Sequence, residues 1–278
     1  MRSPDGSVSP VSPPRPPRRQ RLDQLLVERG LAATRAEAGR LVMAGRVRLS
    51  GRVTAKAGQL VPAGTAVEVE RTAAYASRGG EKLAAALDAF GLEATGRRCL
   101  DVGASTGGFT DCLLQRGAVR VYAIDVGRGQ LLPRLRADPR VVVRDAVNAR
   151  YLDSAVVPEP VDLATVDVSF ISLEKVLPAI VGCLAEEAAV VALVKPQFEV
   201  GRGQVGKGGV VRDPARHRTV VARLAGVAVT LGLAVMAVTP SPLRGPKGNR
   251  EFFLHLARPG PGLTGTALEA AVAAAVGP

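Results

Sequence analysis

The stretch "CLDVGASTGGFTDCLL", from Cys99 to Leu114, decides the fold class of this chain. An apolar run ends at an aspartate, a glycine-rich turn follows, and a helical pattern then begins, which is typical of a strand, a turn and a helix. Further along, continuous runs of Val, Ala, Leu and Ile alternate with helical patterns. Strands of that kind are buried on both faces, so the sequence predicts an α/β fold with a doubly wound, mostly parallel, Rossmann-like sheet.

Seven strands and the helices between them are expected in this domain. The expected helices are 82–90, one from 107, 173–185 and 214–233, and the expected strands are 98–103, 120–126, 141–146, 161–169, 188–196, 234–243 and 251–256. A loop rather than a helix joins the last two strands, so these strands are expected to form an antiparallel pair at the edge of the sheet, with the last strand antiparallel.

A smaller α+β module is expected before this domain. Leu22, Leu25 and Leu26 have helical spacing, Thr34 and Glu37 form a capping box for a second helix, and a hairpin turns at 50–51. The domain boundaries follow as a disordered basic tail (1–20), the module (21–70), a linker (71–80), the large domain (81–260) and a C-terminal tail or helix (261–278).

The charge of the chain points to a polyanionic partner. The formal net charge is +12, and residues 1–70 hold 12 Lys and Arg against 6 Asp and Glu. Solvated arginines are common on protein surfaces, but two helices followed by a basic hairpin suit a module that reads RNA shape and phosphates. The expected RNA contacts are Arg21, Arg35, Arg40, Arg46, Arg48, Arg52 and, in the large domain, Lys207.

The three cysteines and the two histidines do not suggest a metal site. Cys99, Cys112 and Cys183 are widely separated, with no C-x-x-C pair, so we expect reduced core thiols, no metal and a cytoplasmic protein. The N-terminus lacks the apolar segment of a signal peptide. The longest uncharged run, 224–243, contains two glycines and two prolines, so we expect no membrane span.

The glycine-rich turn is the expected ligand site, because ligands of such sheets bind at the carboxyl ends of strands. Its glycines do not form the G-x-G-x-x-G of a dinucleotide fold, and Asp101 would repel a pyrophosphate but attract the cationic end of S-adenosylmethionine. Asp125 is placed for the ribose and Asp145 for the adenine amine, although both could be plain strand-end carboxylates. The residues expected at the cofactor are Asp101, Gly103, Ser105, Thr106, Gly107, Gly108, Phe109, Asp125, Asp145 and Asp167.

Four charged residues are expected at the same rim of the sheet, namely Lys82, Asp167, Lys195 and Glu251. Each alone could be a solvated strand end, but two cations and two anions on one crevice favour a reactive site. A lysine whose charge is destabilised by burial can deprotonate a ribose hydroxyl. The competing lysine, Lys207, ends a G-x-x-x-x-G-K spacing, but Gly208 follows where a P-loop needs Ser or Thr. Lys207 is expected either in a flexible loop over the substrate or as an ordinary solvated lysine.

Several stretches together resemble a known family. They are the glycine-rich turn, "SRGGEKL", "DVSFISL", "LVKPQFEVG", "VGKGGVVRD", "GNREFFLHL" and an N-terminal module similar to the S4-type (alpha-L) RNA-binding motif. The combination, over residues 20–258, resembles the TlyA family, whose catalytic domain is similar to FtsJ-type RNA ribose 2'-O-methyltransferases. The name haemolysin is also used within that family.

The resemblance implies a function and a tetrad. S-adenosylmethionine would be the cofactor. Cytidine 2'-hydroxyls in the RNA of the small ribosomal subunit, the large subunit or both, as free RNA or in subunits, would be the substrate. Apart from this resemblance, the sequence indicates no membrane and no obligate protein partner. Lys82, Asp167, Lys195 and Glu251 would form the family's Lys-Asp-Lys-Glu tetrad. Lys195 would be the deprotonating lysine, Asp167 would orient it, and Lys82 and Glu251 would position the ribose. A non-catalytic RNA-binding assembly factor and a membrane-active haemolysin remain the alternatives.

Overall fold

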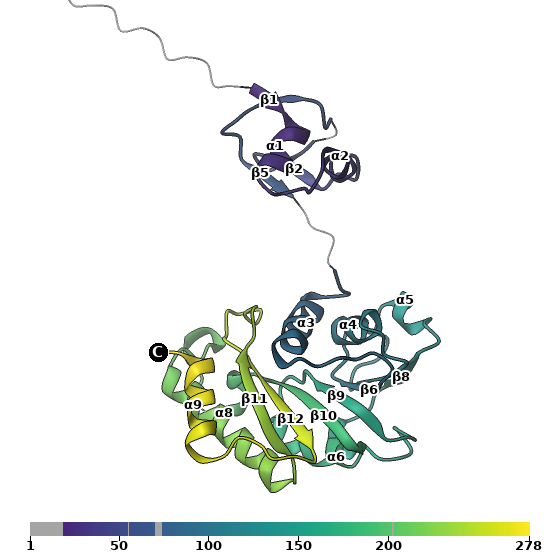
Figure 1. Cartoon of the computed structure of the whole chain (residues 1–278), viewed down its shortest axis with the longest axis vertical. Helices are drawn as coiled ribbons and strands as arrows, with labels where there is room; N and C mark the ends of the chain where they lie inside the picture. The colour runs from purple at the N-terminus through teal and green to yellow at the C-terminus, as the bar shows by residue number, and fades with distance from the viewer. Residues whose placement is uncertain (1–18, 55, 70–73, 202) are drawn as a thin grey trace, which may run out of the picture. The chain divides into compact units, whose positions relative to one another are not determined.

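The chain is described by a computed structural model that covers residues 19–54, 56–69, 74–201 and 203–278 (Figure 1). It divides into two compact units, Met1–Thr72 and Ala73–Pro278, which are described here one at a time.

The first unit is a small α+β fold. Its elements are β1 (Arg19–Arg21), α1 (Leu22–Glu28), α2 (Arg35–Met43), β2 (Val47–Leu49), β3 (Arg52–Val53), β4 (Leu60–Pro62) and β5 (Val67–Val69). The Thr34 hydroxyl accepts a hydrogen bond from the Glu37 N–H, which confirms the predicted helix start. Ser50 and Gly51 both have positive φ, as a tight hairpin between β2 and β3 requires. Buried Leu22, Leu26 and Val42 form its core with other apolar residues.

Two predicted boundaries around this unit were wrong. Arg19 and Gln20 do not belong to a tail, because they pair with Pro62 and Val61 of β4. The first 18 residues of the expected tail lie outside the described part of the chain, as do residues 70–73 at the start of the expected linker. The end of that linker is helical instead, because the Ser77 hydroxyl caps α3 (Arg78–Phe90) by accepting from the Gly79 N–H.

The second unit is built on a seven-stranded sheet with the order β11-β12-β10-β9-β6-β7-β8, which confirms the predicted fold class. Its strands are β6 (Arg98–Val102), β7 (Arg120–Asp125), β8 (Val141–Asp145), β9 (Val161–Val166), β10 (Leu184–Val194), β11 (Ala234–Pro240) and β12 (Phe252–Arg258). Strand β12 is antiparallel to β10 and to β11, and it lies between them. It therefore begins at the edge where the parallel strands end.

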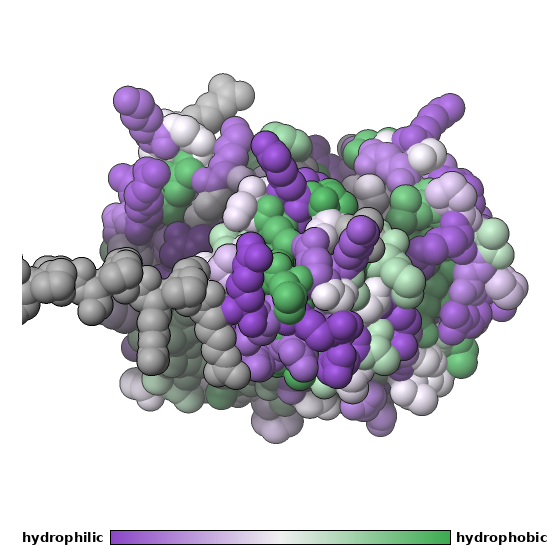
Figure 2. Space-filling view, turned by 90° about the horizontal axis from the view of Figure 1, so that it is seen from above, coloured by the Kyte–Doolittle hydropathy of each residue, from purple (hydrophilic) through white to green (hydrophobic). Residues whose placement is uncertain are grey.

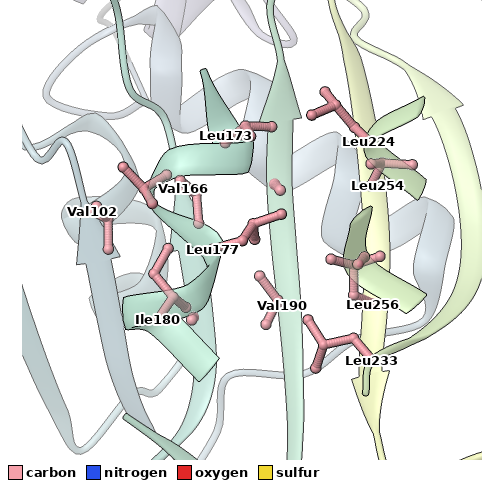
Figure 3. Packing of buried hydrophobic residues seen from close by; sticks show 14 of the residues in the cluster. Val102, Val166, Leu173, Leu177, Ile180, Val190, Leu224, Leu233, Leu254 and Leu256 are labelled. Atoms are coloured by element: carbon pink, nitrogen blue, oxygen red, sulfur yellow. The ribbon is translucent and has the colours of Figure 1, made fainter. Parts of the chain in front are cut away.

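Helices cover both faces of the sheet. They are α3, α4 (Gly108–Gln115), α5 (Pro133–Arg136), α6 (Leu177–Val181), α7 (Pro196–Glu199), α8 (Pro214–Thr230) and α9 (Gly265–Val276). Val190 faces one core cluster and its neighbour Val191 faces the other, as the alternation of a strand requires. In Figure 3, Leu177 and Leu224 from the helices pack on sheet residues of the first cluster, and full burial of each such side chain contributes about 1.5–3 kcal/mol.

The expected helix over 173–185 is broken and shorter in the structure. A 3-10 turn occupies Leu173–Lys175, α6 spans only Leu177–Val181, and Leu184 already pairs with Val161 of β9. Pro178 lies at the start of α6, where it is tolerated, and Gly182 caps its end. The apolar run therefore divides between a short helix and the long strand β10, because a periodic apolar pattern alone does not distinguish the two.

Candidate active site

A pocket of about 810 Å³ lies where the parallel strands β6, β9 and β10 end. Its lining comes from the turn after β6, from the loops after β9 and β10, from the start of α3 and from the loop before β12. Ligands of open parallel sheets bind at this edge because the connecting loops meet there. The pocket is therefore the candidate active site.

The glycine-rich turn after β6 forms one wall of the pocket. Gly103 has a φ of +88°, and a Cβ on it would lie 2.4 Å from the carbonyl oxygen of Asp167, so only glycine fits. A Cβ on Gly108 would lie 2.2 Å from the Ser77 hydroxyl. Because these two glycines lack side chains, the turn after β6 can lie close to the loop after β9, and α4 can lie close to the start of α3.

The residues expected at the cofactor separate into two groups. Gly103, Ser105, Thr106, Gly108, Phe109 and Asp167 line the pocket. Asp101, Gly107, Asp125 and Asp145 are not part of its lining. Gly107 packs against leucines around α5, since a Cβ there would lie 2.2 Å from Leu135.

Asp101 lies beneath the turn, fully buried, and accepts a hydrogen bond from the Thr110 hydroxyl at 2.6 Å. Burial disfavours the charged carboxylate and raises the pKa of Asp101 to about 7. Asp101 is therefore not part of the pocket lining, and its contact with Thr110 ties the end of β6 to α4, which follows the turn.

Asp125 and Asp145 are paired neighbours at the ends of β7 and β8. Asp125 accepts hydrogen bonds from the backbone N–H groups of Ser105 and Gly127, at 2.8 and 2.7 Å. Asp145 accepts from the N–H of Gly129 and pairs with Arg136, and these contacts, the backbone one first, lower the pKa of Asp145. Both carboxylates hold loops beside the turn.

The tetrad residues meet in two ion pairs inside the pocket. Lys82, on α3, places its Nζ 2.5 Å from Glu251 Oε2, and both side chains are almost completely buried. Glu251 directly precedes β12 and reaches this edge because β12 runs opposite to the other strands. The structure thus brings together two residues that are 169 positions apart in the chain.

The second pair joins the loops after two neighbouring strands. Lys195 Nζ lies 2.5 Å from Asp167 Oδ1 and donates a hydrogen bond to the Ser169 hydroxyl at 3.0 Å. All three residues line the pocket. Lys195 is thus held by two groups from one loop, with its ammonium directed at the pocket.

Two aromatic residues at the pocket were not predicted. Phe170 is 91% exposed and has a positive φ, which is uncommon for a bulky residue, and its ring lies 4.9 Å from that of Phe198. Each phenylalanine follows a tetrad residue by three positions, Asp167 and Lys195 respectively. That repeated spacing was the available signal. Other pocket residues absent from the sequence prediction are Ser77, Arg78, Gln197, Lys247 and Asn249.

The predicted RNA contacts lie on both units. In the first unit, Arg21 and Arg35 both pair with the buried Asp23, at 2.9 and 3.1 Å, and the hydrogen bond from Arg21 is the main reason that the pKa of Asp23 falls to about 2. Among the others, Arg40, Arg48 and Arg52 are exposed and Arg46 is half-buried. Lys207, in the second unit, is exposed in a turn next to the pocket residue Gly209.

The histidines have packing roles. His217 is buried, with Nε2 3.0 Å from the Val211 carbonyl oxygen, and His255 stacks near Phe90.

Within the described residues, no group of three or more His, Cys, Asp or Glu side chains could hold a metal ion. Over the same residues, no helix is long and apolar enough to cross a membrane. Hydrophilic side chains prevail on the face seen in Figure 2.

Comparisons with known proteins give a consistent result. Residues 75–258 match the family of FtsJ-like methyltransferases, and residues 20–67 match the S4 domain. The 16S/23S rRNA (cytidine-2'-O)-methyltransferase TlyA of Mycobacterium tuberculosis is 51% identical over 240 residues, which cover 86% of this chain and 90% of the relative. YqxC of Bacillus subtilis, named as an rRNA methyltransferase, is 45% identical over 252 residues, which cover 90% of each chain.

A solved structure agrees over both units. It is that of a hemolysin-named protein of Streptococcus thermophilus, with a TM-score of 0.70 and 41% identity, and the match covers 92% of this chain and 95% of that chain.

Proposed function

The chain belongs to the FtsJ-like methyltransferase family and carries an S4 domain, and from this membership we propose that it methylates the 2'-hydroxyl of cytidine in ribosomal RNA. Two relatives named as rRNA methyltransferases span nearly the whole chain. The resemblance noted in the sequence is thereby confirmed, and the chain is an enzyme of the methyltransferase class. An rRNA substrate implies that it acts in the cytoplasm, with the ribosomes.

One observation carries the proposal, namely that two lysine–carboxylate pairs converge in a single pocket beside the glycine-rich turn. The turn residues Gly103, Ser105, Thr106, Gly108 and Phe109 would hold S-adenosylmethionine. The close approach of Gly103 to the Asp167 carbonyl oxygen leaves no room for a side chain and keeps the turn beside the loop after β9, so that both line the same pocket. When bound, the cofactor supplies a methyl group activated on a sulfonium.

Lys195 is the residue that takes the proton. In its uncharged form, the Lys195 amine would accept the proton of the 2'-hydroxyl, which makes the ribose oxygen a nucleophile. Asp167 and Ser169 then hold the ammonium that forms. Lys82 and Glu251 position the ribose, and the apolar lining around the tetrad, including Phe109, limits water at the reacting atoms.

The S4 unit would hold the RNA while the second unit acts on it. Its arginines, with Arg21 and Arg35 held in place by Asp23, are suited to phosphates. We extend the proposal to the RNA of both ribosomal subunits, because the Mycobacterium tuberculosis relative is named for 16S and 23S rRNA.

Transfer of tritium from labelled S-adenosylmethionine tests the function directly. We expect label in ribosomal RNA, in isolated subunits or in naked RNA, and mapping should place it in 2'-O-methylcytidine. A Lys195→Ala protein that folds and binds cofactor should transfer none. If the wild-type protein binds ribosomal RNA but leaves no label in either form, the enzymatic proposal fails and a role as an RNA-binding assembly factor is favoured.

A further inference from the structure

The two loops that carry the Lys195–Asp167 pair are joined a second time, away from the pocket. The first loop, residues 167–173, follows β9, and the second, residues 195–199, follows β10. Glu199 closes the second loop, and its side chain is only 2% exposed. Its carboxylate accepts hydrogen bonds from the Leu173 N–H, at 2.8 Å on Oε1, and from the Ser172 hydroxyl, at 2.7 Å on Oε2.

Arg223, on α8, completes this junction. Its guanidinium donates to Glu199 Oε2 at 3.1 Å and to the Glu199 carbonyl oxygen at 3.0 Å, and it also pairs with Glu174 at 2.6 Å. Arg223 therefore neutralises the buried carboxylate and fastens both loops to a long helix. A buried carboxylate with this many partners has one well-defined position.

None of the residues of this junction lines the pocket. Glu199 stands four positions after Lys195, and Ser172 stands five positions after Asp167. Between the junction and the tetrad, Phe170 and Phe198 also contact each other across the two loops. A change at Glu199 would therefore reach the tetrad as a shift of one loop against the other.

We propose that Glu199, with Arg223, is a positioning pair that sets the distance between Lys195 and Asp167 in the methyl-transfer step. This inference rests on the proposed function. A displacement of about 1 Å at a catalytic group can cost roughly a hundredfold in rate. The pair is thus expected to act on turnover rather than on binding, and turnover is compared at a temperature where each variant is folded.

The test compares Glu199→Gln with Asp162→Asn. The introduced amide has the shape of the carboxylate, but its NH2 group would face either the Leu173 N–H or the Ser172 hydroxyl and the Arg223 guanidinium, which now donate to one carboxylate oxygen. Asp162 is a matched control, because it accepts from the backbone and guanidinium of Arg98, at 2.8 to 3.1 Å, without touching either loop. We expect kcat to fall about ten- to a hundredfold in Glu199→Gln. The KM for RNA and the Kd for cofactor should stay within about twofold.

Variants of the arginine separate charge from packing. Arg223→Lys, which keeps a cation, should retain more activity than Arg223→Met. The double variant Glu199→Gln/Arg223→Met should be no slower than the worse single variant, because both changes break one junction. A wild-type kcat in Glu199→Gln, or an equal loss in Asp162→Asn, would overturn the proposal, as would an effect confined to KM or Kd.

Amide hydrogen exchange tests the junction between the two loops without any substrate. In Glu199→Gln, the amides of residues 168–173 should exchange faster than in wild type, whereas Asp162→Asn should leave them unchanged. If the wild-type protein transfers no methyl group to ribosomal RNA, the proposed function fails, and exchange still decides whether Glu199 joins the loops. Unchanged exchange in Glu199→Gln would contradict the junction itself.

Discussion

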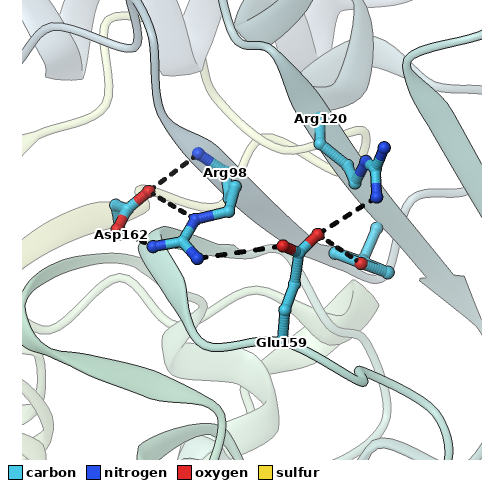
Figure 4. A network of polar contacts seen from close by, with 5 residues as sticks. Arg98, Arg120, Glu159 and Asp162 are labelled. Atoms are coloured by element: carbon cyan, nitrogen blue, oxygen red, sulfur yellow. Dashed lines mark hydrogen bonds and ion pairs between the residues drawn. The ribbon is translucent and has the colours of Figure 1, made fainter.

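The two ends of the parallel sheet carry the same kinds of charged residue in different arrangements. At the amino ends of the strands, Arg98 binds Asp162 at 2.8 Å, and Glu159 receives hydrogen bonds from Tyr122 at 2.7 Å and Arg120 at 3.3 Å (Figure 4). These groups satisfy one another, and none of them lines the pocket. At the carboxyl ends, the two lysine–carboxylate pairs face a pocket of about 810 Å³.

The difference teaches that an ion pair does not by itself indicate a reactive site. The amino-end network holds neighbouring strands together and leaves no group directed at a ligand. At the carboxyl end the Lys82–Glu251 pair is buried and the Lys195–Asp167 pair is half-buried, and both pairs line a space that a substrate can enter. Phe170, beside these pairs, has a positive φ. Strained backbone of this kind clusters at active sites and ligand-binding segments.

The largest expected effect is at the buried pair of the carboxyl end. Lys82→Met should abolish methyl transfer and lower the free energy of unfolding by about 3–5 kcal/mol, because it leaves Glu251 charged and unpaired in the interior. Urea denaturation and a transfer assay measure the two effects. The double variant Lys82→Met/Glu251→Gln should regain most of the stability and remain inactive, and full activity in it would remove both residues from the mechanism.

The next effect is a change of folding stability with pH, which has opposite signs at the carboxyl and amino ends of the parallel strands. Burial raises the pKa of Asp101 to about 7, so the folded state holds a proton that the unfolded state has lost above about pH 4. Stability from this group is thus present at low pH and lost as pH rises toward 7, by up to about 4 kcal/mol. Asp101→Asn should remove that decline, as measured by urea denaturation at pH 5 and pH 8.

Asp162 provides the opposite case. The hydrogen bond from Arg98 lowers the pKa of Asp162, so its stabilising contribution is present above the unfolded pKa of about 4 and is lost as pH falls through the lower folded value. Asp162→Asn should therefore be less stable than wild type at neutral pH and approach it in acid. Equal pH responses of the two variants would contradict the contrast between the two ends.

A smaller effect is expected from Arg98→Met. It should lower Tm by a few degrees, because strands β6 and β9 lose their shared ion pair, and leave kcat unchanged at a temperature where the protein is folded. Lys195, in the pocket, provides the comparison. Lys195→Met should leave Tm nearly unchanged and remove activity. A large fall of kcat in Arg98→Met would show that the amino end does contribute to the site.

The smallest effect is expected at Lys207, beside the pocket. Lys207→Ala should raise the KM for RNA about two- to threefold and reduce the slope of log binding against log salt by about 1, as for one lost phosphate contact. Turnover at saturating RNA should not change. An unchanged salt dependence would make Lys207 an ordinary solvated residue.

The sequence predicted most of the sheet and the members of the tetrad, but not every helix or contact. The glycine-rich turn and the continuous apolar strands between helices were recognisable because their signals are local. The division of residues 173–185 between a 3-10 turn, a short helix and β10 was not, because pairing with β9 decided it. Glu199 was missed, since no sequence signal indicates that its carboxylate is buried among donors from another loop.

By itself, the sequence determined the fold class, the RNA-binding module and the four residues at one edge of the sheet. Only the tertiary structure decided that Lys82 pairs with Glu251 and that Asp101 is buried outside the pocket lining. Apolar periodicity and turn residues act over a few positions, so they can be read along the chain. Pairing and burial depend on the order of strands in space, in which β12 lies beside β10, and that order is a property of long-range packing.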